Sequence, residues 1–432
     1  MKIYYPMIFL LITYAFAGGI DLFAENEKVV TLKEAINEAL EHNPIWRAQR
    51  FEVQSKKAEI GPTGSYDDPM VAFAAKDYPV DSFSRKEHGM TGDEISLTQK
   101  IPFPGKLTKL RAAAEKEYHS QEKQYEQLKW NLIRDVKLAY YSLFLALKEQ
   151  ALLKEQKNFI KQLIVVSRNK YTIGKLSQAE LLSFQVEEAK LIGELLSNEK
   201  EISARKATLK TLLGKSNLDF NATVLEETQK TAMDHSKIQP DILEKRVLQK
   251  NRMLLALETA VDSSKQKLSY AKLGYLPDFE VMAGYTIREP RPADDGVDLF
   301  TGKVGLTLPI WAISKQSEQI KGAKAEKAKI EALLESSQIE LKNKIQTLHA
   351  ELFEADQKIK LFETGILPLS RQAVLSGKSA YLTGKLEYLN LLTFIQDRYQ
   401  AEIAYFETLT KHESKISEIE AFLGEEIGGE KQ

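Results

Sequence analysis

Histidine, cysteine and carboxylate side chains are the first candidates for chemistry, because they supply general acids and bases, nucleophiles and metal ligands. The chain has no cysteine, which excludes disulfides and thiolate sites. Its six histidines are scattered and show no H-x-x-H or H-E-x-x-H spacing. There is no G-x-S-x-G, P-loop or Rossmann glycine run either. We therefore expect no enzyme, no cofactor and no metal site.

A short charged motif with a glycine occurs twice. Tyr171-Thr-Ile-Gly-Lys-Leu176 is followed by a Leu-Leu pair, and Tyr381-Leu-Thr-Gly-Lys-Leu386 is followed by another at the same distance. The offset is 381 − 171 = 210 residues, about half the chain. Each copy predicts a long helix that reverses at its glycine. A repeated hairpin directs the search for function toward assembly rather than a catalytic pocket.

Other landmarks repeat at nearly the same offset, which indicates a duplicated unit. Pro69 matches Pro277, Pro102 matches Pro309, and a Leu-Gly pair ends each unit at Gly214 and Gly424. We expect a signal peptide at 1–24, a first unit at 25–214, a connecting segment at 215–236, a second unit at 237–424 and a tail at 425–432. Strands are expected at about 69–77, 94–102, 277–286 and 302–310, and hairpin tips at about 171–176 and 381–386.

The predicted strands alternate between polar and apolar residues, with period 2. Apolar residues such as Leu97, Val281 and Leu306 share one face. The polar face carries Ser96, Thr98, Lys100, Asp278, Glu280, Lys303 and Thr307. These seven residues are the candidates for lining a water-filled lumen.

Two helical segments are far longer than those of globular domains. Residues 106–170 contain no proline or glycine and are rich in Ala, Leu, Glu, Lys and Gln. Apolar residues recur there every three or four positions, which predicts a narrow seam. Such a helix would be about 100 Å long. Residues 314–380 are similar, with a possible kink at Pro368. Rods of this length need neighbours along their whole length.

The first residues are typical of an export signal. Lys2 gives a positive start, and residues 7–17 form an apolar stretch of signal-peptide length. A membrane anchor is the alternative interpretation. No later run reaches the ~20 apolar residues of a spanning helix. The net charge of −1 gives no basic excess, so nucleic acid is not an expected partner.

Four strands cannot close a barrel, and an open sheet edge is not tolerated in lipid. Three copies of the chain would supply twelve strands, an even number within the range of outer-membrane barrels. Aromatic residues near the strand ends, Phe103, Tyr285 and Trp311, suit the membrane interface. The alternative is a soluble protein in which two small hairpins cap the helices.

The chain resembles the outer membrane efflux protein (TolC) family over essentially its whole length after the signal. The resemblance is carried by the paired Y-x-x-G hairpins, by Gln99-Lys-Ile-Pro-Phe-Pro-Gly-Lys106, by Asn43-Pro44 and by the Leu-Gly ends. The Ile-Pro-Phe-Pro-Gly-Lys junction is most similar to members that serve heavy-metal efflux pumps of the resistance-nodulation-division type.

The resemblance implies a mainly helical homotrimer with a periplasmic α-barrel and a twelve-stranded β-barrel in outer-membrane lipid. The tips would close the periplasmic end until an adaptor protein and an inner-membrane pump engage them. The chain would then be a passive conduit, with heavy-metal cations as one candidate cargo. Organic toxins or a secreted polypeptide are alternative cargoes. A soluble periplasmic adaptor or scaffold is the alternative function.

The resemblance also suggests which residues form the gate. In the family's prototype, two acids lie six and nine residues after the second tip glycine; here those positions hold Asn390 and Thr393. The first unit carries Glu180 and Ser183 instead, so the prototype's acidic ring is not reproduced in the second copy. The candidates are therefore the tip glycines, the residues six positions after them, and Asp397 and Arg398, which could pair between helices. The lysines that follow the glycines are candidate adaptor contacts, and solvated surface charges are the alternative for each charged residue. The full set is Gly174, Lys175, Glu180, Gly384, Lys385, Asn390, Asp397 and Arg398.

Overall fold

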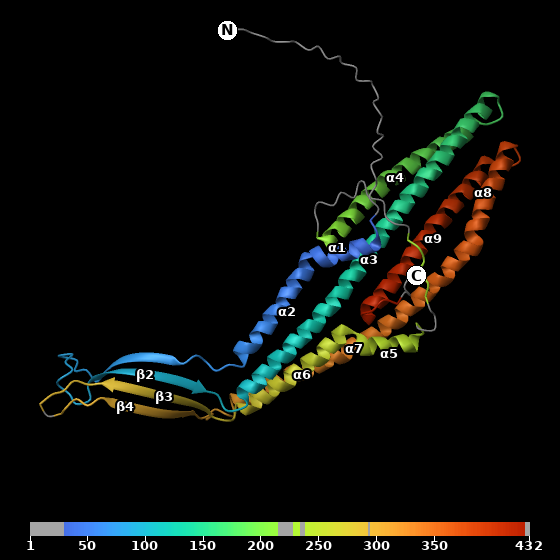
Figure 1. Ribbon diagram of the computed structural model, residues 1–432. Coiled ribbons are helices and arrows are strands. Elements are labelled where there is room, and N and C mark those ends of the chain that lie inside the picture. Colours follow the sequence, from blue (N-terminus) through green and yellow to red (C-terminus); the bar gives the residue numbers. More distant parts are fainter. Residues whose placement is uncertain (1–29, 215–227, 234–237, 293, 428–432) are drawn as a thin grey trace, which may run out of the picture.

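The structure is a computed structural model that describes residues 30–214, 228–233, 238–292 and 294–427. The expected signal peptide lies outside the described residues. So do most of the expected connecting segment and the end of the expected tail. The chain is elongated: a sheet lies at one end, and two helical hairpin tips lie at the other (Figure 1).

The elements follow the same order twice. The helices are α1 (Leu32–His42), α2 (Pro44–Thr63), α3 (Lys106–Thr172), α4 (Gln178–Leu213), α5 (Pro240–Lys250), α6 (Arg252–Leu273), α7 (Gln316–Leu361), α8 (Leu367–Leu382) and α9 (Tyr388–Leu423). The strands are β1 (Met70–Lys76), β2 (Gly92–Ile101), β3 (Asp278–Ile287) and β4 (Leu299–Thr307). Each half of the chain thus contains two shorter helices, two strands and a long helical hairpin.

The four strands form one antiparallel sheet in the order β1-β2-β3-β4. Leu97 lies opposite Val71 on one side and Ala283 on the other, which places these three side chains on the same face. The fourth strand begins three residues before the expected 302–310, because Leu299 already pairs with Thr286. The sheet therefore joins the two repeats of the chain through β2 and β3.

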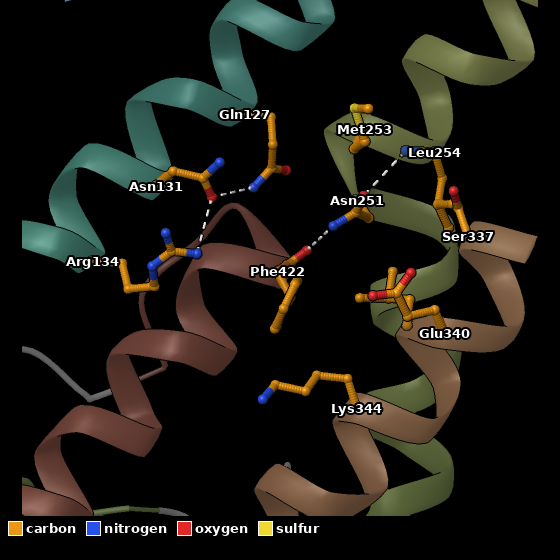
Figure 2. Close-up of a pocket in the computed structure, with 11 residues that line it drawn as sticks. Gln127, Asn131, Arg134, Asn251, Met253, Leu254, Ser337, Glu340, Lys344 and Phe422 are labelled. Carbon is orange, nitrogen blue, oxygen red and sulfur yellow. Dashed lines mark hydrogen bonds between the residues drawn. The ribbon is translucent and has the colours of Figure 1, made fainter. Parts of the chain in front are cut away.

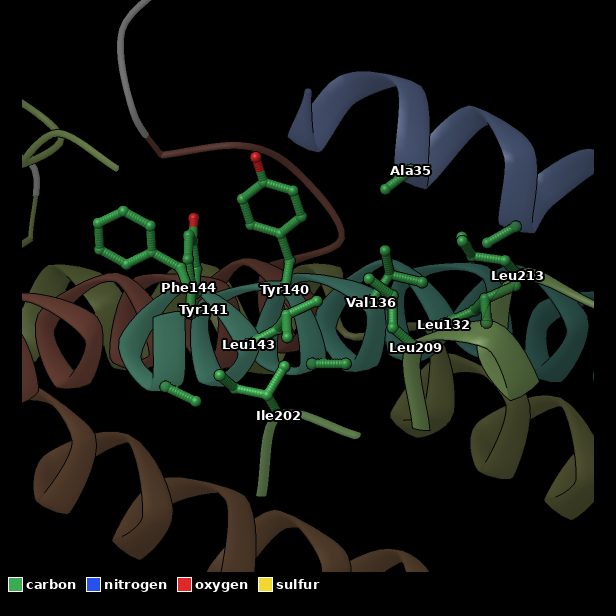
Figure 3. Packing of buried hydrophobic residues seen from close by; sticks show 13 residues of the cluster. Ala35, Leu132, Val136, Tyr140, Tyr141, Leu143, Phe144, Ile202, Leu209 and Leu213 are labelled. Atoms are coloured by element: carbon green, nitrogen blue, oxygen red, sulfur yellow. The ribbon is translucent and has the colours of Figure 1, made fainter. Parts of the chain in front are cut away.

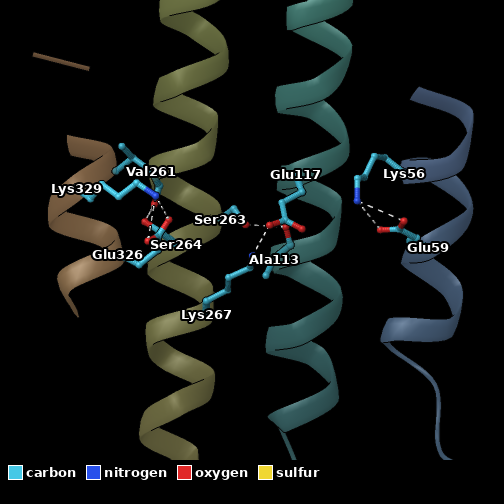
Figure 4. A network of polar contacts seen from close by, with 10 residues as sticks. All are labelled: Lys56, Glu59, Ala113, Glu117, Val261, Ser263, Ser264, Lys267, Glu326 and Lys329. Atoms are coloured by element: carbon cyan, nitrogen blue, oxygen red, sulfur yellow. Dashed lines mark hydrogen bonds and ion pairs between the residues drawn. The ribbon is translucent and has the colours of Figure 1, made fainter. Parts of the chain in front are cut away.

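Helix α3 is the central element. Its 67 residues span about 100 Å, as the absence of proline and glycine predicted. It packs against α2 and α6 near the sheet and against α4 and α9 toward the tips. Figure 4 shows α2, α3, α6 and α7 side by side near the sheet, where Lys267 of α6 pairs with Glu117 of α3 and the Ser263 hydroxyl donates to the Ala113 carbonyl (2.9 Å).

The second rod is interrupted as the proline predicted. A π-helical turn, Phe362–Ile366, separates α7 from α8, and Pro368 stands in the first turn of α8. Proline lacks the N–H that would bond to the carbonyl of Thr364, and its ring crowds that carbonyl. One extra residue in the turn removes the conflict without ending the helix.

Three clusters of buried apolar residues follow one another along the rods. In the cluster of Figure 3, the small Ala35 of α1 lets that helix approach Val136 and Tyr140 of α3, and Leu209 closes the layer from α4. A second cluster joins α3 and α4 to α8 and α9, and a third joins α5, α6, α7 and α9. The hydrophobic core is thus divided into three clusters, each lying between neighbouring helices.

In each repeat, one asparagine side chain caps the start of a helix and also binds the end of another helix. The Asn43 side chain caps α2 by accepting from the Trp46 N–H, and its Nδ2 donates to the Leu212 carbonyl at the end of α4 (2.8 Å). Asn251 does the same for α6 and donates to the Phe422 carbonyl at the end of α9 (2.9 Å). Each asparagine satisfies free groups at the ends of two helices at once.

Within the described residues, none of the helices is apolar over a stretch long enough to cross a bilayer.

Candidate functional site

The two hairpin tips have the same backbone. Gly174 and Gly384 adopt φ values of +71° and +77°, in the left-handed region that glycine enters without strain. The Lys175 N–H donates to the Lys170 carbonyl (2.9 Å), and the Lys385 N–H donates to the Ala380 carbonyl (2.8 Å). Both lysine side chains are exposed, as the glycines are. The repeated motif therefore builds the same exposed reversal twice.

The two tips differ in how the returning helix begins. Ser177 and Glu180 form a capping box at the start of α4, and the Glu180 carboxylate accepts from the Ser177 N–H (3.0 Å). Glu387 stands at the equivalent position before α9 and makes no side-chain cap. Asn390 is exposed at this end of α9. Glu180, a gate candidate from the sequence, is thus engaged in a helix cap.

The repeated tyrosine also has different surroundings in the two copies. Tyr171 is 43% exposed, whereas Tyr381 is 3% exposed and packs edge-on against Phe184. The Tyr381 hydroxyl lies 3.0 Å from the Ser167 hydroxyl. The Lys170 side chain donates to the backbone carbonyl of Tyr381 (2.7 Å). Burial raises the pKa of Tyr381 above its ordinary value, so the phenol stays protonated. Tyr381 therefore connects the second hairpin to the first.

A charged contact joins the hairpins farther from the tips. Arg398 of α9 lies 2.8 Å from the Glu155 carboxylate of α3 and 3.4 Å from Glu402. Glu402 is buried and is also 2.9 Å from Arg371 of α8. Partial burial lowers the pKa of Arg398, but Glu402 and Glu155 outweigh it and raise the pKa. Gln396 adds a hydrogen bond to Glu187 of α4 (2.8 Å).

The structure therefore brings some gate candidates together and not others. Arg398 lies in the contact between the hairpins, whereas Asp397 is exposed and has no cation within 4.0 Å among the described residues. Sequence reasoning missed the residues that bind Tyr381 and Arg398, namely Ser167, Lys170, Glu155 and Glu402. No short-range signal marks them, because each partner lies on a different helix, far away in the sequence.

At the other end of the molecule, the sheet has an exposed apolar face and a polar face. Leu97 is 49% exposed, whereas its neighbour Ser96 is 9% exposed. The register places Ser96, Thr98, Lys100, Glu280, Lys303 and Thr307 on the polar face. Lys100 lies directly opposite Glu280, and Thr98 lies opposite Met282. In a sheet of a water-soluble protein, polar side chains face outward and apolar ones face inward. Here the orientation is reversed.

Two acids on the sheet have definite partners. Asp278, the seventh polar candidate, accepts from the Phe103 N–H (2.7 Å) and from Lys106 (2.8 Å), so it fixes the junction between the sheet and α3. Glu94, which sequence reasoning missed, is buried on the polar face between Lys76 (3.3 Å) and the Thr286 hydroxyl (3.3 Å). Within the described residues, no group of three His, Cys, Asp or Glu could hold a metal ion.

Comparison with known proteins agrees with this architecture. A family model described as outer membrane efflux protein matches residues 35–215 and 243–425, one stretch per repeat. No curated protein matches the chain.

Several solved outer-membrane proteins have a similar fold at low sequence identity. The outer membrane protein VceC of Vibrio cholerae is 16% identical with a TM-score of 0.75, over 92% of this chain and 96% of that one. The CmeC outer membrane channel of Campylobacter jejuni is 15% identical with a TM-score of 0.74, over 92% and 87%. CusC is 15% identical with a TM-score of 0.70, over 91% and 92%.

The mainly helical fold with four strands, expected from the duplicated sequence, is confirmed by these structures. Localisation in the outer membrane, with a large helical periplasmic portion, follows from the family and its solved relatives. The alternative interpretation, a soluble periplasmic adaptor or scaffold, is thereby excluded. The chain belongs to the outer membrane efflux protein family and is a channel protein, not an enzyme.

Proposed function

We propose that the chain forms a homotrimeric channel-tunnel of a tripartite efflux system. An inner-membrane pump and a periplasmic adaptor would deliver the cargo, and the chain would conduct it passively to the exterior. The observation that carries this proposal is the sheet with its outward apolar face and its polar face of Ser96, Thr98, Lys100, Glu280, Lys303 and Thr307.

The two outer strands of the sheet support a trimer. β1 and β4 are unpaired edges in the single chain, and hydrocarbon does not tolerate free backbone groups. Pairing β4 of one copy with β1 of the next satisfies both edges, and three copies close a ring of twelve strands. The helices also need neighbouring copies of the chain to cover their exposed apolar residues. These residues are Leu182, Val186 and Leu196 of α4 and Leu369 and Leu375 of α8.

The hairpin tips are the proposed adaptor contact and gate. Lys175 and Lys385 are exposed at the tips beside Gly174 and Gly384 and would meet the adaptor. Glu180, Asn390, Asp397 and Arg398 lie along the first turns behind the tips and would take part in closure. Release of the contacts that Tyr381 and Arg398 make with α3 would let the second hairpin move outward from the first.

We propose heavy-metal cations as the cargo, because the Ile101-Pro-Phe-Pro-Gly-Lys106 junction is most similar to members that serve such pumps. The test is expression in a cell that lacks its own efflux channel but keeps the pump and adaptor. Lower cellular copper, silver or zinc with unchanged tolerance of organic toxins supports this cargo. The opposite pattern replaces it with an organic cargo.

The channel itself is tested by electrophoresis of the outer-membrane extract with and without heating. A species of about three times the monomer mass that collapses on heating is expected of a trimeric barrel. A monomer that migrates identically in both conditions would contradict the trimer.

A further inference from the structure

A cavity of about 350 Å³ lies in the middle of the helical wall. It occupies the place where α6 begins and α9 ends, between α3 and α7 (Figure 2). Its lining residues come from α3, α6, α7 and α9. Its volume is at the lower end of the range of small-molecule sites.

Gln127 of α3 presents an unsatisfied acceptor to this cavity. The side chain is 7% exposed, and its Nε2 donates to the Ala421 carbonyl (2.9 Å) and to the Asn131 side chain (3.1 Å). Its Oε1 has no hydrogen-bond partner among the described residues. In Figure 2 this oxygen is directed toward α6, into the space between the helices. Buried carbonyl oxygens are normally satisfied. This one has less than 1 Å² of accessible surface, so a bound donor reaches it when the Gln127 side chain turns toward the cavity.

Glu340 of α7 presents a second acceptor. Its carboxylate points into the cavity in Figure 2, and no cation lies within 4.0 Å of it among the described residues. The two cations at the rim already have acids: Arg134 lies 2.8 Å from Asp135, and Lys344 lies 3.7 Å from Glu418. The cavity can therefore accept hydrogen bonds from a ligand that carries positively charged N–H groups.

Part of the remaining lining is apolar. Leu254 and Leu341 are buried, and Met253 and Phe422 complete an apolar surface. Asn251 is fully used, since it accepts from the Leu254 N–H (3.1 Å) and donates to the Phe422 carbonyl (2.9 Å). A ligand must therefore combine a cationic head with an apolar body.

We propose that this cavity binds a small organic cation that carries N–H donors on an apolar body. The N–H groups donate to Gln127 Oε1 and to the Glu340 carboxylate, and the body packs against Leu254 and Leu341. Occupancy would bridge α3, α6 and α7 at the seam where the two halves of the helical wall meet.

The test uses the full-length protein in detergent and benzamidine as the probe, with binding followed by ligand-observed NMR titration. Benzamidine has a flat apolar ring and an amidinium with N–H donors. Benzamide and benzoate have the same ring with a neutral and an anionic head. We expect benzamidine to bind with at least about tenfold higher affinity than either analogue, as a charge-assisted hydrogen bond predicts.

Two variants and their controls place the site. Glu340→Gln removes the charge and should weaken benzamidine binding about tenfold, whereas Glu335→Gln on the same helix should leave it unchanged. Ser337→Phe should fill the cavity and abolish binding, whereas Ser336→Phe, at an exposed position, should not. Circular dichroism checks that each variant is folded. No binding of benzamidine, equal binding of benzoate, or equal affinity in Glu340→Gln would overturn the proposal.

Discussion

The hydroxyl groups of Tyr381 and Ser167 lie 3.0 Å apart and join the end of α8 to the end of α3. Lys170 adds to this contact, since its Nζ lies 4.3 Å from the centre of the Tyr381 ring and donates to the Tyr381 carbonyl. The equivalent tyrosine of the first repeat, Tyr171, is exposed. The duplicated motif has therefore acquired two roles, a free tip in one copy and a link between hairpins in the other.

Tyr381→Phe should loosen this link. The change removes the hydroxyl and leaves the ring against Phe184, so about 1 kcal/mol of the contact is lost. In planar bilayers we expect a higher conductance, or more frequent opening, of the purified channel. Tyr171→Phe is the matched control and should behave as the parent protein. Equal conductance of the two variants would remove Tyr381 from the gate.

Gly174→Val and Gly384→Val should impair the hairpin tips. An added Cβ meets no atom within 4 Å at either glycine, so the penalty comes from the left-handed backbone alone. That penalty is about 1–2 kcal/mol per residue and is larger for a β-branched side chain. Efflux by the double variant, in a cell with pump and adaptor, should fall.

Gly193→Ala is the matched control for the tip glycines, because it lies within α4 and an added Cβ also meets nothing there. It should leave efflux unchanged, since alanine favours a helix. Normal efflux by the double valine variant would count against the tips as the site of partner contact.

Leu97→Lys should hinder assembly of the barrel, whereas Thr98→Lys should be tolerated. Leu97 lies on the exposed apolar face and Thr98 on the polar face. A lysine that faces the middle of the bilayer costs about 2–4 kcal/mol. The measurement is the amount of heat-sensitive trimer in the outer membrane. Equal amounts for both variants would contradict the assigned orientation of the sheet.

The sequence was enough to predict the duplication, the strands and the tips, because each depends on local pattern. Period-2 alternation separates Leu97 from Thr98, and glycine is the residue that best suits the left-handed backbone at Gly174. Pairings between distant helices carry no such pattern. Glu155 and Arg398 are 243 residues apart, and which of many surface charges meet is decided by how the rods pack.

The capping asparagines illustrate the same limit. Asn43 precedes a proline, which is a recognisable helix start. Its counterpart Asn251 precedes Arg252 rather than a proline, and nothing in the sequence shows that its side chain also binds the end of α9. The equivalence of the two asparagines becomes visible only in the structure. Asn43 donates to the Leu212 carbonyl and Asn251 to the Phe422 carbonyl, at corresponding positions of the two repeats.

Asn251→Ala should destabilise the helical wall. The change removes the cap of α6 and leaves the half-buried Phe422 carbonyl without its donor, for a loss of about 2 kcal/mol. Thermal unfolding followed by circular dichroism should show a lower midpoint. Asn343→Ala, at an exposed position of α7, is the control. An unchanged midpoint for Asn251→Ala would show that water replaces both hydrogen bonds.

A double-mutant cycle tests the charged contact between α9 and α3. Glu155 is about half exposed, so solvent screening limits its pair with Arg398 to about 0.5–1 kcal/mol of coupling. Arg398→Gln should cost more than Glu155→Gln, because Arg398 also faces the buried Glu402, which then depends on Arg371 alone. Reversing both charges, Glu155→Arg with Arg398→Glu, should not restore the parent stability, since residue 398 would then repel Glu402. Full restoration of the unfolding midpoint by the reversed pair would mean that Glu155 is the sole partner and that Glu402 plays no part in holding the hairpins together.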